Sequence, residues 1–436
     1  MIKFIFVCII LCLTAIANMA FAENTEPQEL LIILRDNGTI TQEQYDKLKQ
    51  TTEHKAQEEQ SSRVDVKVIS KGGVEVQTYD GNFSFKLGGR VFVDAAYYDE
   101  DKNALGDGTE LRKARIDTKG IIFGDWDYQF EIDFADGDAD ISDAYIRYNA
   151  FFPTRITVGQ FKEPFSLEEL TSSKFITFME RALPNEFAPD RNIGIGIHTH
   201  GEVWTAAAGV FGEEFDDDAD DEGDEGWGVT GRLTYSPVHL DTRALHLGAA
   251  ASYRIPDDEK KVKFDARPES HVTDIKYVDT DKIKNMDSLI KYGLEASGVL
   301  GPFSLQGEYI YTNIGRDNGS EDVDFDGWYV YGSWFLTGES RHYKFKKGAF
   351  GRVTPMSKLG ALELATRYST IDLNDGPITG GEGKNITFGF NYYFNPYIRL
   401  MLNYIIVDND EDADADGDVM GNDDPRIVQA RLQVDF

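Results

Sequence analysis

The chain has 436 residues, with 76 acidic against 44 basic side chains, and a formal charge of −32 at pH 7. This acidity excludes nucleic acid as a partner, because phosphate binding requires a basic surface. After residue 22 the chain contains no cysteine, so that part can form no disulfide and offers no thiolate chemistry.

The first 22 residues have the order of a secretory signal peptide. Lys3 supplies the positive charge, Phe4–Ile16 is an apolar run, and Ala20–Ala22 is an A-x-A cleavage signal. The run is shorter than the ~20 residues of a membrane-spanning helix, which favours a cleaved signal over an uncleaved anchor. We expect export with residues 1–22 removed, together with Cys8 and Cys12.

Residues 23–62 are predicted to be helical. A first helix should end at Asn37-Gly38, and Thr41–Gln44 fits a capping box that begins a second helix. Beyond Leu48 the pattern has almost no apolar face, which is typical of a solvated helix or linker, and a coiled-coil oligomerisation stalk is the alternative. Residues 63–82 are expected to be a linker to the next domain.

Residues 83–436 alternate apolar and polar side chains in segments of about ten. In 126–134 the aromatic and aliphatic residues fall on one face and the acids and glutamine on the other, and residues 428–436 repeat this pattern. Period two places each set on one face of a sheet. No apolar stretch after residue 22 is long enough for a transmembrane helix, so we expect an all-β domain.

A transmembrane antiparallel barrel and a soluble sheet both fit this alternation. Three features favour the membrane: aromatic residues near segment ends, a final aromatic residue, and connections that alternate between short and long. The predicted short turns are Gly124–Asp125, Phe152-Pro153, Ser236-Pro237, Gly301-Pro302 and Asn395-Pro396. The predicted long loops are 99–109, 162–192, 213–226, 255–288, 313–325 and 409–424.

The spacing predicts about sixteen strands, with residues 338–358 forming either a long turn or an extra hairpin. An even number leaves both termini on the short-turn side, and sixteen strands enclose an aqueous channel. These observations indicate passive transport across an outer membrane.

Residues 159–196 (GQFKEPFSLEELTSSKFITFMERALPNEFAPDRNIGIG) resemble the phosphate-selective porin O and P family of outer-membrane channels. Further matching stretches are ELRKARI at 110–116, ISDAYIRY at 141–148, WFLTGE at 334–339, LGALELATRYS at 359–369, NYYFNPYIRLMLNY at 391–404, the closing VQARLQVDF, and the leader LRDNGTITQEQYDKL. The resemblance implies a sixteen-stranded barrel that is usually trimeric, with the loop after the fifth strand folded inward. It also implies lumenal arginines and lysines that select anions, phosphate or polyphosphate among them.

The long segment between the fifth and sixth strands is the candidate constriction, because loops of this length are uncommon unless functional. Its candidate basic residues are Lys162, Lys174, Arg181 and Arg191. The alternative is structural: Arg181 and Arg191 would pair with Glu180 and Glu186 and hold the loop in place.

Period two also places ten basic residues on the lumenal face of the strands, where they are candidate pore-lining residues. They are Arg90, Lys113, Arg115, Arg147, Arg232, Arg254, Lys291, Arg367, Arg399 and Arg431. The same faces carry Asp94, Asp117, Glu131, Asp133, Asp143, Glu295, Glu308 and Glu363. Neighbouring opposite charges on a wet wall mostly neutralise each other, so wall solvation is the alternative role for any one of them.

Two predicted outer loops are strongly acidic: residues 213–225 contain ten acids and residues 408–424 contain nine. Such a rim favours cations at low salt, although salt shortens its range. Asp412, Asp414 and Asp416, followed by Gly417, match the start of a calcium loop, with Asp423 at the twelfth position where glutamate is usual. No cofactor is expected apart from this candidate Ca²⁺ site.

These patterns predict a passive outer-membrane channel of a Gram-negative bacterium, with small inorganic anions or other small hydrophilic solutes as its cargo. A general or cation-leaning porin is the first alternative, and a non-channel adhesin or tether is the second. An enzyme is not expected, because no G-x-S-x-G or H-E-x-x-H motif is present. A homotrimer surrounded by outer-membrane lipid is the expected assembly.

Overall fold

The computed structural model describes residues 27–61, 64–68, 73–135, 137–215, 224–413 and 420–436. The chain divides into two compact units: the first ends at Asp65 and includes Thr78–Asp80, and the second contains Val66–Gln77 and Gly81–Phe436. Within the described residues, no helix has both the length and the apolar character to cross a membrane.

The first unit contains the two predicted helices, α2 (Pro27–Asp36) and α3 (Gln42–Ser61). Gly38 adopts a positive φ of 70° after α2, as a helix-terminating glycine does. At the start of α3 the Thr41 hydroxyl accepts from the Gln44 amide at 3.2 Å, and the Gln44 side chain accepts from the Thr41 amide at 2.9 Å. Both arms of the predicted capping box are therefore confirmed.

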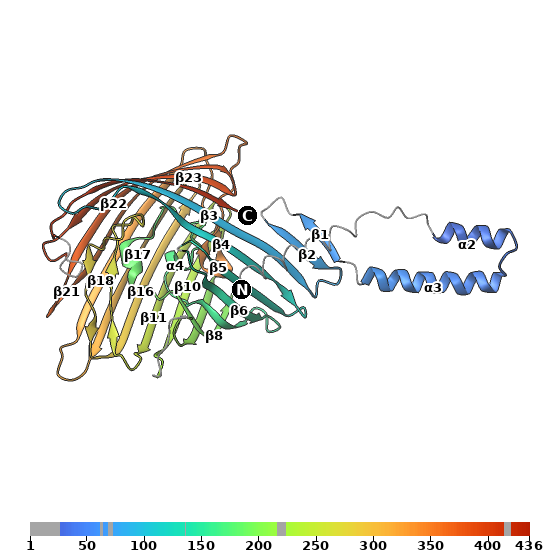
Figure 1. Cartoon of the computed structure of the whole chain (residues 1–436), viewed down its shortest axis with the longest axis horizontal. Helices are drawn as coiled ribbons and strands as arrows, with labels where there is room; N and C mark the ends of the chain where they lie inside the picture. Colours follow the sequence, from blue (N-terminus) through green and yellow to red (C-terminus); the bar gives the residue numbers. More distant parts are fainter. Residues whose placement is uncertain (1–26, 62–63, 69–72, 136, 216–223, 414–419) are drawn as a thin grey trace. The chain divides into compact units, whose positions relative to one another are not determined.

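The second unit is a closed antiparallel barrel of sixteen long strands (Figure 1), as predicted. The strands are β3 (Ser84–Asp99), β4 (Gly108–Ile122), β5 (Trp126–Asp133), β6 (Asp140–Tyr148), β7 (Arg155–Lys162), β8 (Arg191–His200), β9 (Trp204–Phe211), β10 (Trp227–Leu240), β11 (Arg243–Ile255), β16 (Met286–Leu300), β17 (Phe303–Arg316), β18 (Val323–Phe335), β21 (Ala361–Asp375), β22 (Ile378–Asn395), β23 (Ile398–Asn409) and β24 (Arg426–Asp435). Each strand pairs with the next, and pairing of β24 with β3 closes the cylinder. Two further strands, β1 (Val64–Val68) and β2 (Val74–Thr78), lie in the segment expected to be a linker, and β2 pairs with the start of β3.

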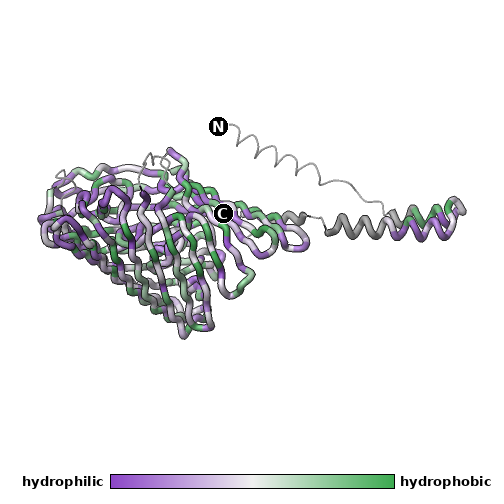
Figure 2. The backbone as a smooth tube through the Cα atoms, turned by 90° about the horizontal axis from the view of Figure 1, so that it is seen from below, coloured by the Kyte–Doolittle hydropathy of each residue, from purple (hydrophilic) through white to green (hydrophobic). Residues whose placement is uncertain are grey.

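The two faces of the barrel wall follow the predicted alternation. On β24 the Val428 and Leu432 side chains are 50% and 46% exposed, whereas the intervening Arg431 is 1% exposed. Figure 2 shows the same mixture of hydrophobic and hydrophilic positions along the strands. An apolar outer surface and a polar inner surface are what a lipid-embedded cylinder requires.

The connections correct two parts of the predicted pattern. Ser236-Pro237 is not a turn: it lies inside β10, at the register shift between Tyr235 and Val238, and the turn follows at Asp241 and Thr242. Proline fits there because a bulge does not require its missing N–H. Short and long connections also do not alternate strictly, since residues 336–360 form a long connection on the short-turn side and residues 376–377 a short one opposite.

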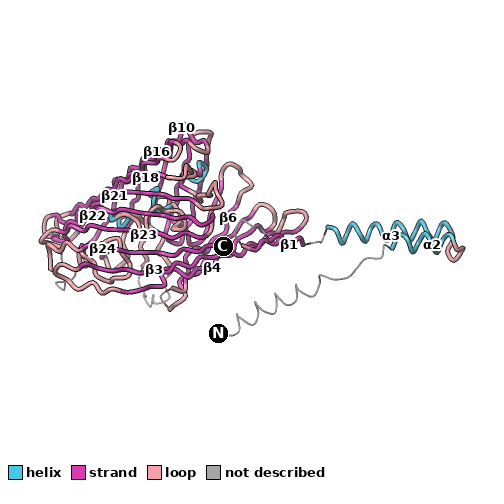
Figure 3. The backbone as a smooth tube through the Cα atoms, turned by 90° about the horizontal axis from the view of Figure 1, so that it is seen from above, coloured by secondary structure: helices cyan, strands magenta, loops and turns pink. Residues whose placement is uncertain are grey.

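Three long connections contain their own small elements (Figure 3). Residues 163–190 carry α4 (Leu167–Leu170) and a 3₁₀ turn, η1 (Leu183–Phe187). Residues 256–285 carry β12 (Lys261–Val262), β13 (Asp265–Ala266), β14 (Val278–Asp279) and β15 (Ile283–Lys284), and residues 336–360 carry β19 (Tyr343–Lys344), η2 (Phe345–Lys347) and β20 (Ala349–Phe350). Phe165, Phe187 and Phe264 from the first two segments share one buried cluster with Ile310 of β17 and Ile371 of β21, so both segments pack against the inside of the wall.

Candidate functional site

The connection between β7 and β8, residues 163–190, crosses the inside of the barrel; we call it the inward loop. Ser166 begins α4 by accepting from the Glu169 amide at 3.1 Å. Glu308, on the distant strand β17, accepts from the amides of Leu167 and Glu168 at 2.9 and 2.7 Å. The loop after the fifth barrel strand is thus attached to the eleventh, which narrows the bore between them.

Three wall arginines hold the backbone of the inward loop from another side. Arg399 donates to the carbonyl of Ile176 at 2.8 Å, and Arg367 donates to the carbonyl of Glu180 at 3.0 Å. Arg431 donates to the carbonyl of Met179, and its guanidinium also pairs with Asp94 at 2.6 Å. A guanidinium presents several donors in a rigid fork, so one side chain can both neutralise an acid and fix a carbonyl.

The acids of the inward loop are used to fasten it. Glu163 accepts from Asn192 at 2.8 Å and from Arg254 at 2.7 Å. Glu169 pairs with Lys162 and lies 3.2 Å from the Arg181 guanidinium, and Glu180 pairs with Arg112 at 3.0 Å and with Arg431 at 2.5 Å. These carboxylates therefore point at fixed partners rather than at the water of the bore.

A second segment, residues 336–360, enters the bore from the end that carries both chain termini of the barrel; we call it the inward hairpin. Tyr343 lies 2.7 Å from His246 of β11, and the Gly348 carbonyl accepts from Arg232 of β10 at 2.8 Å. The Phe350 amide donates to Thr171 of the inward loop at 3.3 Å. This contact joins the two inward segments inside the barrel.

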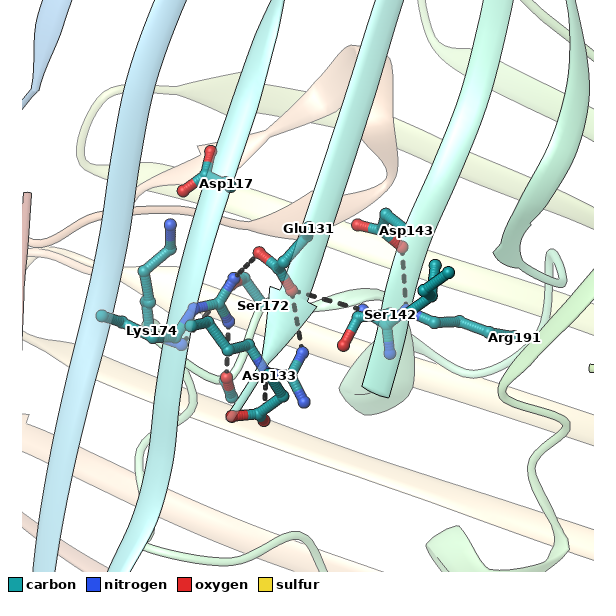
Figure 4. Close-up of polar contacts among 12 residues, drawn as sticks. Asp117, Glu131, Asp133, Ser142, Asp143, Ser172, Lys174 and Arg191 are labelled. Carbon is teal, nitrogen blue, oxygen red and sulfur yellow. Dashed lines mark hydrogen bonds and ion pairs between the residues drawn. The ribbon is translucent and has the colours of Figure 1, made fainter. Parts of the chain in front are cut away.

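Between these segments and strands β3–β7 lies a cavity of about 530 Å³, which we call the basic cavity. Four acids line it, and each has at least one basic partner: Asp117, Glu131, Asp143 and Asp190. Figure 4 shows part of this wall, with Arg191 directed at Asp143. Thirteen basic side chains line the same space: Lys86, Arg90, Lys113, Arg115, Lys119, Arg147, Lys162, Lys174, Arg181, Arg191, Lys344, Lys347 and Arg352.

The excess of positive charge is largely carried by lysines. Among the described residues, five lysines of the basic cavity form no ion pair with an acid: Lys86, Lys113, Lys174, Lys344 and Lys347. Burial, with the nearby Arg90 charge, lowers the pKa of Lys174 to about 8. Burial and the Lys344 charge lower the pKa of Lys347 to about 8 as well. With pKa values of about 8, Lys174 and Lys347 are still mostly charged at pH 7. Both therefore present an ammonium group to the cavity without an acidic partner among the described residues.

A second cavity of about 320 Å³ lies on the other side of the inward loop, and we call it the outer cavity. Its charges balance, with Arg112, Arg181, Arg267 and Lys276 against Glu180, Glu186, Asp265 and Glu269. Burial, together with the Asp265 charge, raises the pKa of Glu186 to about 7. Arg181 lines both cavities.

All four candidate constriction residues line the basic cavity: Lys162, Lys174, Arg181 and Arg191. The predicted alternative was that Arg181 and Arg191 hold the loop in place through ion pairs with Glu180 and Glu186. Both arginines do form ion pairs, but with other acids. Arg181 pairs with Glu169 and donates to three carbonyls of its own loop, and Arg191 pairs with Asp143 at 2.8 Å and Asp190 at 3.1 Å rather than with Glu186. Both arginines therefore hold the loop and face the cavity.

The ten candidate pore-lining residues separate into two groups. Arg90, Lys113, Arg115 and Arg147 line the basic cavity. The other six do not line it: Arg232 pairs with Glu295, Arg254 with Glu163, Arg367 with Glu269 and Arg431 with Asp94, Lys291 lies over the Phe264 ring, and Arg399 bonds Gln433. Sequence reasoning missed five basic residues of the cavity: Lys86 and Lys119 on the strands, and Lys344, Lys347 and Arg352, whose only signal was the basic run in the ambiguous segment 338–358.

The candidate calcium loop lies partly outside the described residues, which exclude Asp414 and Asp416, and Asp412 is described at their edge. Asp423 is fully buried and accepts from the amides of Lys102 and Asn103, from the Asn103 side chain at 2.6 Å and from Tyr277 at 2.6 Å. Within the described part of the chain, no cluster of three or more histidine, cysteine or acidic side chains is arranged to hold a metal ion. Asp423 thus fastens three outer connections to one another.

Comparison with known proteins identifies relatives of this architecture. The family model "Phosphate-selective porin O and P" matches residues 85–436. Porin O of Pseudomonas aeruginosa is 30% identical over 400 residues, which cover 81% of this chain and 91% of that protein.

Solved structures share the fold at lower identity. An anion-selective porin from Comamonas acidovorans is similar with a TM-score of 0.52 at 17% identity, covering 81% of this chain and 100% of that one. The outer membrane channel DcaP of Acinetobacter baumannii is similar with a TM-score of 0.50 at 13% identity, covering 83% of this chain and 99% of that one. These two similarities concern the barrel fold.

Proposed function

The chain belongs to the phosphate-selective porin O and P family and is an outer-membrane channel for small solutes, and we propose that its pore prefers anions, with phosphate among them. Family and fold point to a channel rather than an enzyme. The observation that carries the proposed preference is the excess of thirteen basic over four acidic side chains around the basic cavity.

The physical basis is electrostatic. A charged group at a narrow, partly dehydrated point of the pore acts on a passing ion more strongly than one in open water. Arg181, Lys174 and Lys347, which line the basic cavity, would replace part of the hydration of an oxyanion. The acids that could attract cations there are already paired, for example Glu131 with Arg90 and Arg115.

The direct test is the ion selectivity of the purified protein in a planar bilayer. In a potassium chloride gradient, the reversal potential should have the sign of chloride permeation, and millimolar phosphate added to either side should reduce the chloride current. A reversal potential of the opposite sign would overturn the proposed anion preference. The channel assignment itself predicts conductance whichever ion is preferred.

A general or cation-leaning porin is the second candidate, and one observation favours it. Residues 213–225 and 408–424, predicted from the sequence to be outer loops, contain ten and nine acids, although residues 216–223 and 414–419 lie outside the described residues. They would enrich cations at the entrance when salt is low. We favour the anion preference because the basic cavity lies inside the barrel, between the wall and the two inward segments, where its charges line the space open to a solute.

Three further proposals follow from the sequence patterns and the family. Residues 1–22 are removed on export as a signal peptide, which N-terminal sequencing of the mature protein tests. The barrel assembles as a homotrimer in outer-membrane lipid, which native mass spectrometry of the detergent-solubilised protein tests. Residues 23–62 form a separate helical domain, which limited proteolysis tests.

A further inference from the structure

The basic cavity contains aromatic rings as well as charges. Tyr145 and Phe161 of the wall, Phe175 of the inward loop and Tyr397 of the turn between β22 and β23 all line it. Each of these four side chains is only partly buried. Each ring therefore keeps part of its surface open to the cavity, where a solute can reach it.

The rings and the basic groups are placed against one another. The Lys344 ammonium lies 4.9 Å from the centre of the Phe175 ring, and the Arg352 guanidinium lies 5.2 Å from the same ring. Arg352 also lies 4.4 Å from the Tyr397 ring. Arg352 is paired with Asp435, whereas Lys344 and Lys174, the neighbour of Phe175 in the chain, have no acidic partner among the described residues. One wall of the cavity thus combines partly exposed rings with two uncompensated positive charges.

Compact oxyanions alone do not account for this combination. The face of an aromatic ring carries partial negative charge, so a hydrated phosphate ion gains nothing by approaching it. An anion joined to a planar apolar group gains from both features, because its charge can meet Lys174 or Lys344 while its apolar group covers a ring. The cavity volume of about 530 Å³ falls within the ~300–1,000 Å³ typical of small-molecule sites.

We propose that the basic cavity is a subsite for organic anions in which a phosphate or carboxylate group is joined to an aromatic ring. This inference rests on the proposed anion preference and specifies its substrate class. Phe175 and Tyr397 contact the ring of the solute, and Lys174, Lys344 and Arg352 contact its charged group. Inorganic phosphate uses only the second set.

The test compares three blockers of the chloride current that share one charged group: inorganic phosphate, methyl phosphate and phenyl phosphate. Phenyl phosphate should block at about a tenfold lower concentration than methyl phosphate, as expected from covering one ring face with apolar surface. Replacing the ring by Phe175→Leu should reduce this ratio towards one. The matched control is Phe215→Leu, an exposed ring in an outer connection that does not line the cavity, which should leave the ratio at its wild-type value.

The outcomes separate this inference from the proposed function. Equal block by phenyl and methyl phosphate, with effective block by inorganic phosphate, would overturn the aromatic subsite and leave the anion preference intact. Cation selectivity without block by any of the three would overturn both. If Phe175→Leu does not fold, the ratio measured on the wild-type channel alone still decides.

Discussion

Neutralising two unpaired lysines of the basic cavity should weaken phosphate block strongly. The variant is Lys174→Gln combined with Lys347→Gln, which removes two positive charges and keeps polar side chains at both positions. Neither lysine forms an ion pair with an acid in the described chain, so neither substitution leaves a buried carboxylate without its partner. The change therefore acts on passing ions rather than on the fold.

The magnitude follows from Coulomb's law. Two unit charges ~4 Å apart interact by about 1 kcal/mol in water and by about 4 kcal/mol at an effective dielectric constant of ~20. The pore is only partly dehydrated, so we take the value in water as the minimum for each charge, and about 1 kcal/mol corresponds to about a fivefold change in affinity. If the two sites act independently, the double variant should need at least about 25-fold more phosphate for half-block.

The assay is titration of phosphate against chloride conductance in a planar bilayer, with the reversal potential measured on the same channels. The matched control is Lys260→Gln, because Lys260 is an exposed lysine in the 256–285 connection that pairs with Asp317 and does not line the basic cavity. A half-blocking concentration within twofold of wild type in the double variant would refute the role of these lysines. An equal change in the control would assign the effect to net charge rather than to position.

Three more outcomes are expected. Raising the pH from 7 to 9.5 should reduce anion selectivity most steeply near pH 8, since lysines lose charge above their pKa and Lys174 and Lys347 have pKa values of about 8; a flat series of reversal potentials would contradict this. Arg431→Met should lower the free energy of unfolding in detergent by about 3–5 kcal/mol, because it leaves the buried Asp94 carboxylate without its partner. The control, Arg426→Met at an exposed position of the same strand, should have little effect on it. Asp423→Ala should increase protease cleavage of the outer connections, because the amides of Lys102 and Asn103 and the Tyr277 hydroxyl would lose their hydrogen-bond acceptor. Adding calcium should not alter the cleavage pattern of the wild-type protein.

The barrel wall was predictable because its determinants are local. Alternation of period two assigns each residue of a strand to one face, and the capping box at Thr41 needs only residues three positions apart. The strand count was correct for the same reason. The prediction of a turn at Ser236-Pro237 was wrong because proline is common in turns. Whether proline can instead lie in a strand at a bulge depends on the pairing with the neighbouring strand, which the local sequence does not show.

The interior could not be derived from local pattern, because its partners are distant in the chain. Arg431 meets Glu180 across 251 positions, and Arg399 meets the Ile176 carbonyl across 223. Period two correctly placed both arginines on the lumenal face, but the same pattern fits a side chain that faces water and one that holds a loop. The inward hairpin was similarly hidden: the sequence left residues 338–358 as either a long turn or an extra hairpin, and only the contacts of Tyr343 and Gly348 with the wall show that the segment folds inward.

The net charge of the chain and the charge of the basic cavity have opposite signs, which leads to a final prediction. Residues 213–225, predicted from the sequence to form an outer loop, contain ten acids, and residues 216–223 of this segment lie outside the described residues. At ~1 M salt the screening length is about 3 Å, so these acids should not affect an anion at the entrance, whereas at ~0.01 M it is about 30 Å and they should repel it.

Changing Asp216, Asp217, Asp218, Asp220 and Asp221 to asparagine should therefore speed the onset of phosphate block about tenfold at 10 mM salt, and not at 1 M. The effect should appear when phosphate is added from the outer end and be absent when it is added from the other end, which serves as the internal control. Equal acceleration from both ends would mean that these acids act inside the pore. Selectivity would then depend on the total charge of the channel, and the sign of the basic cavity alone could not determine which ions pass.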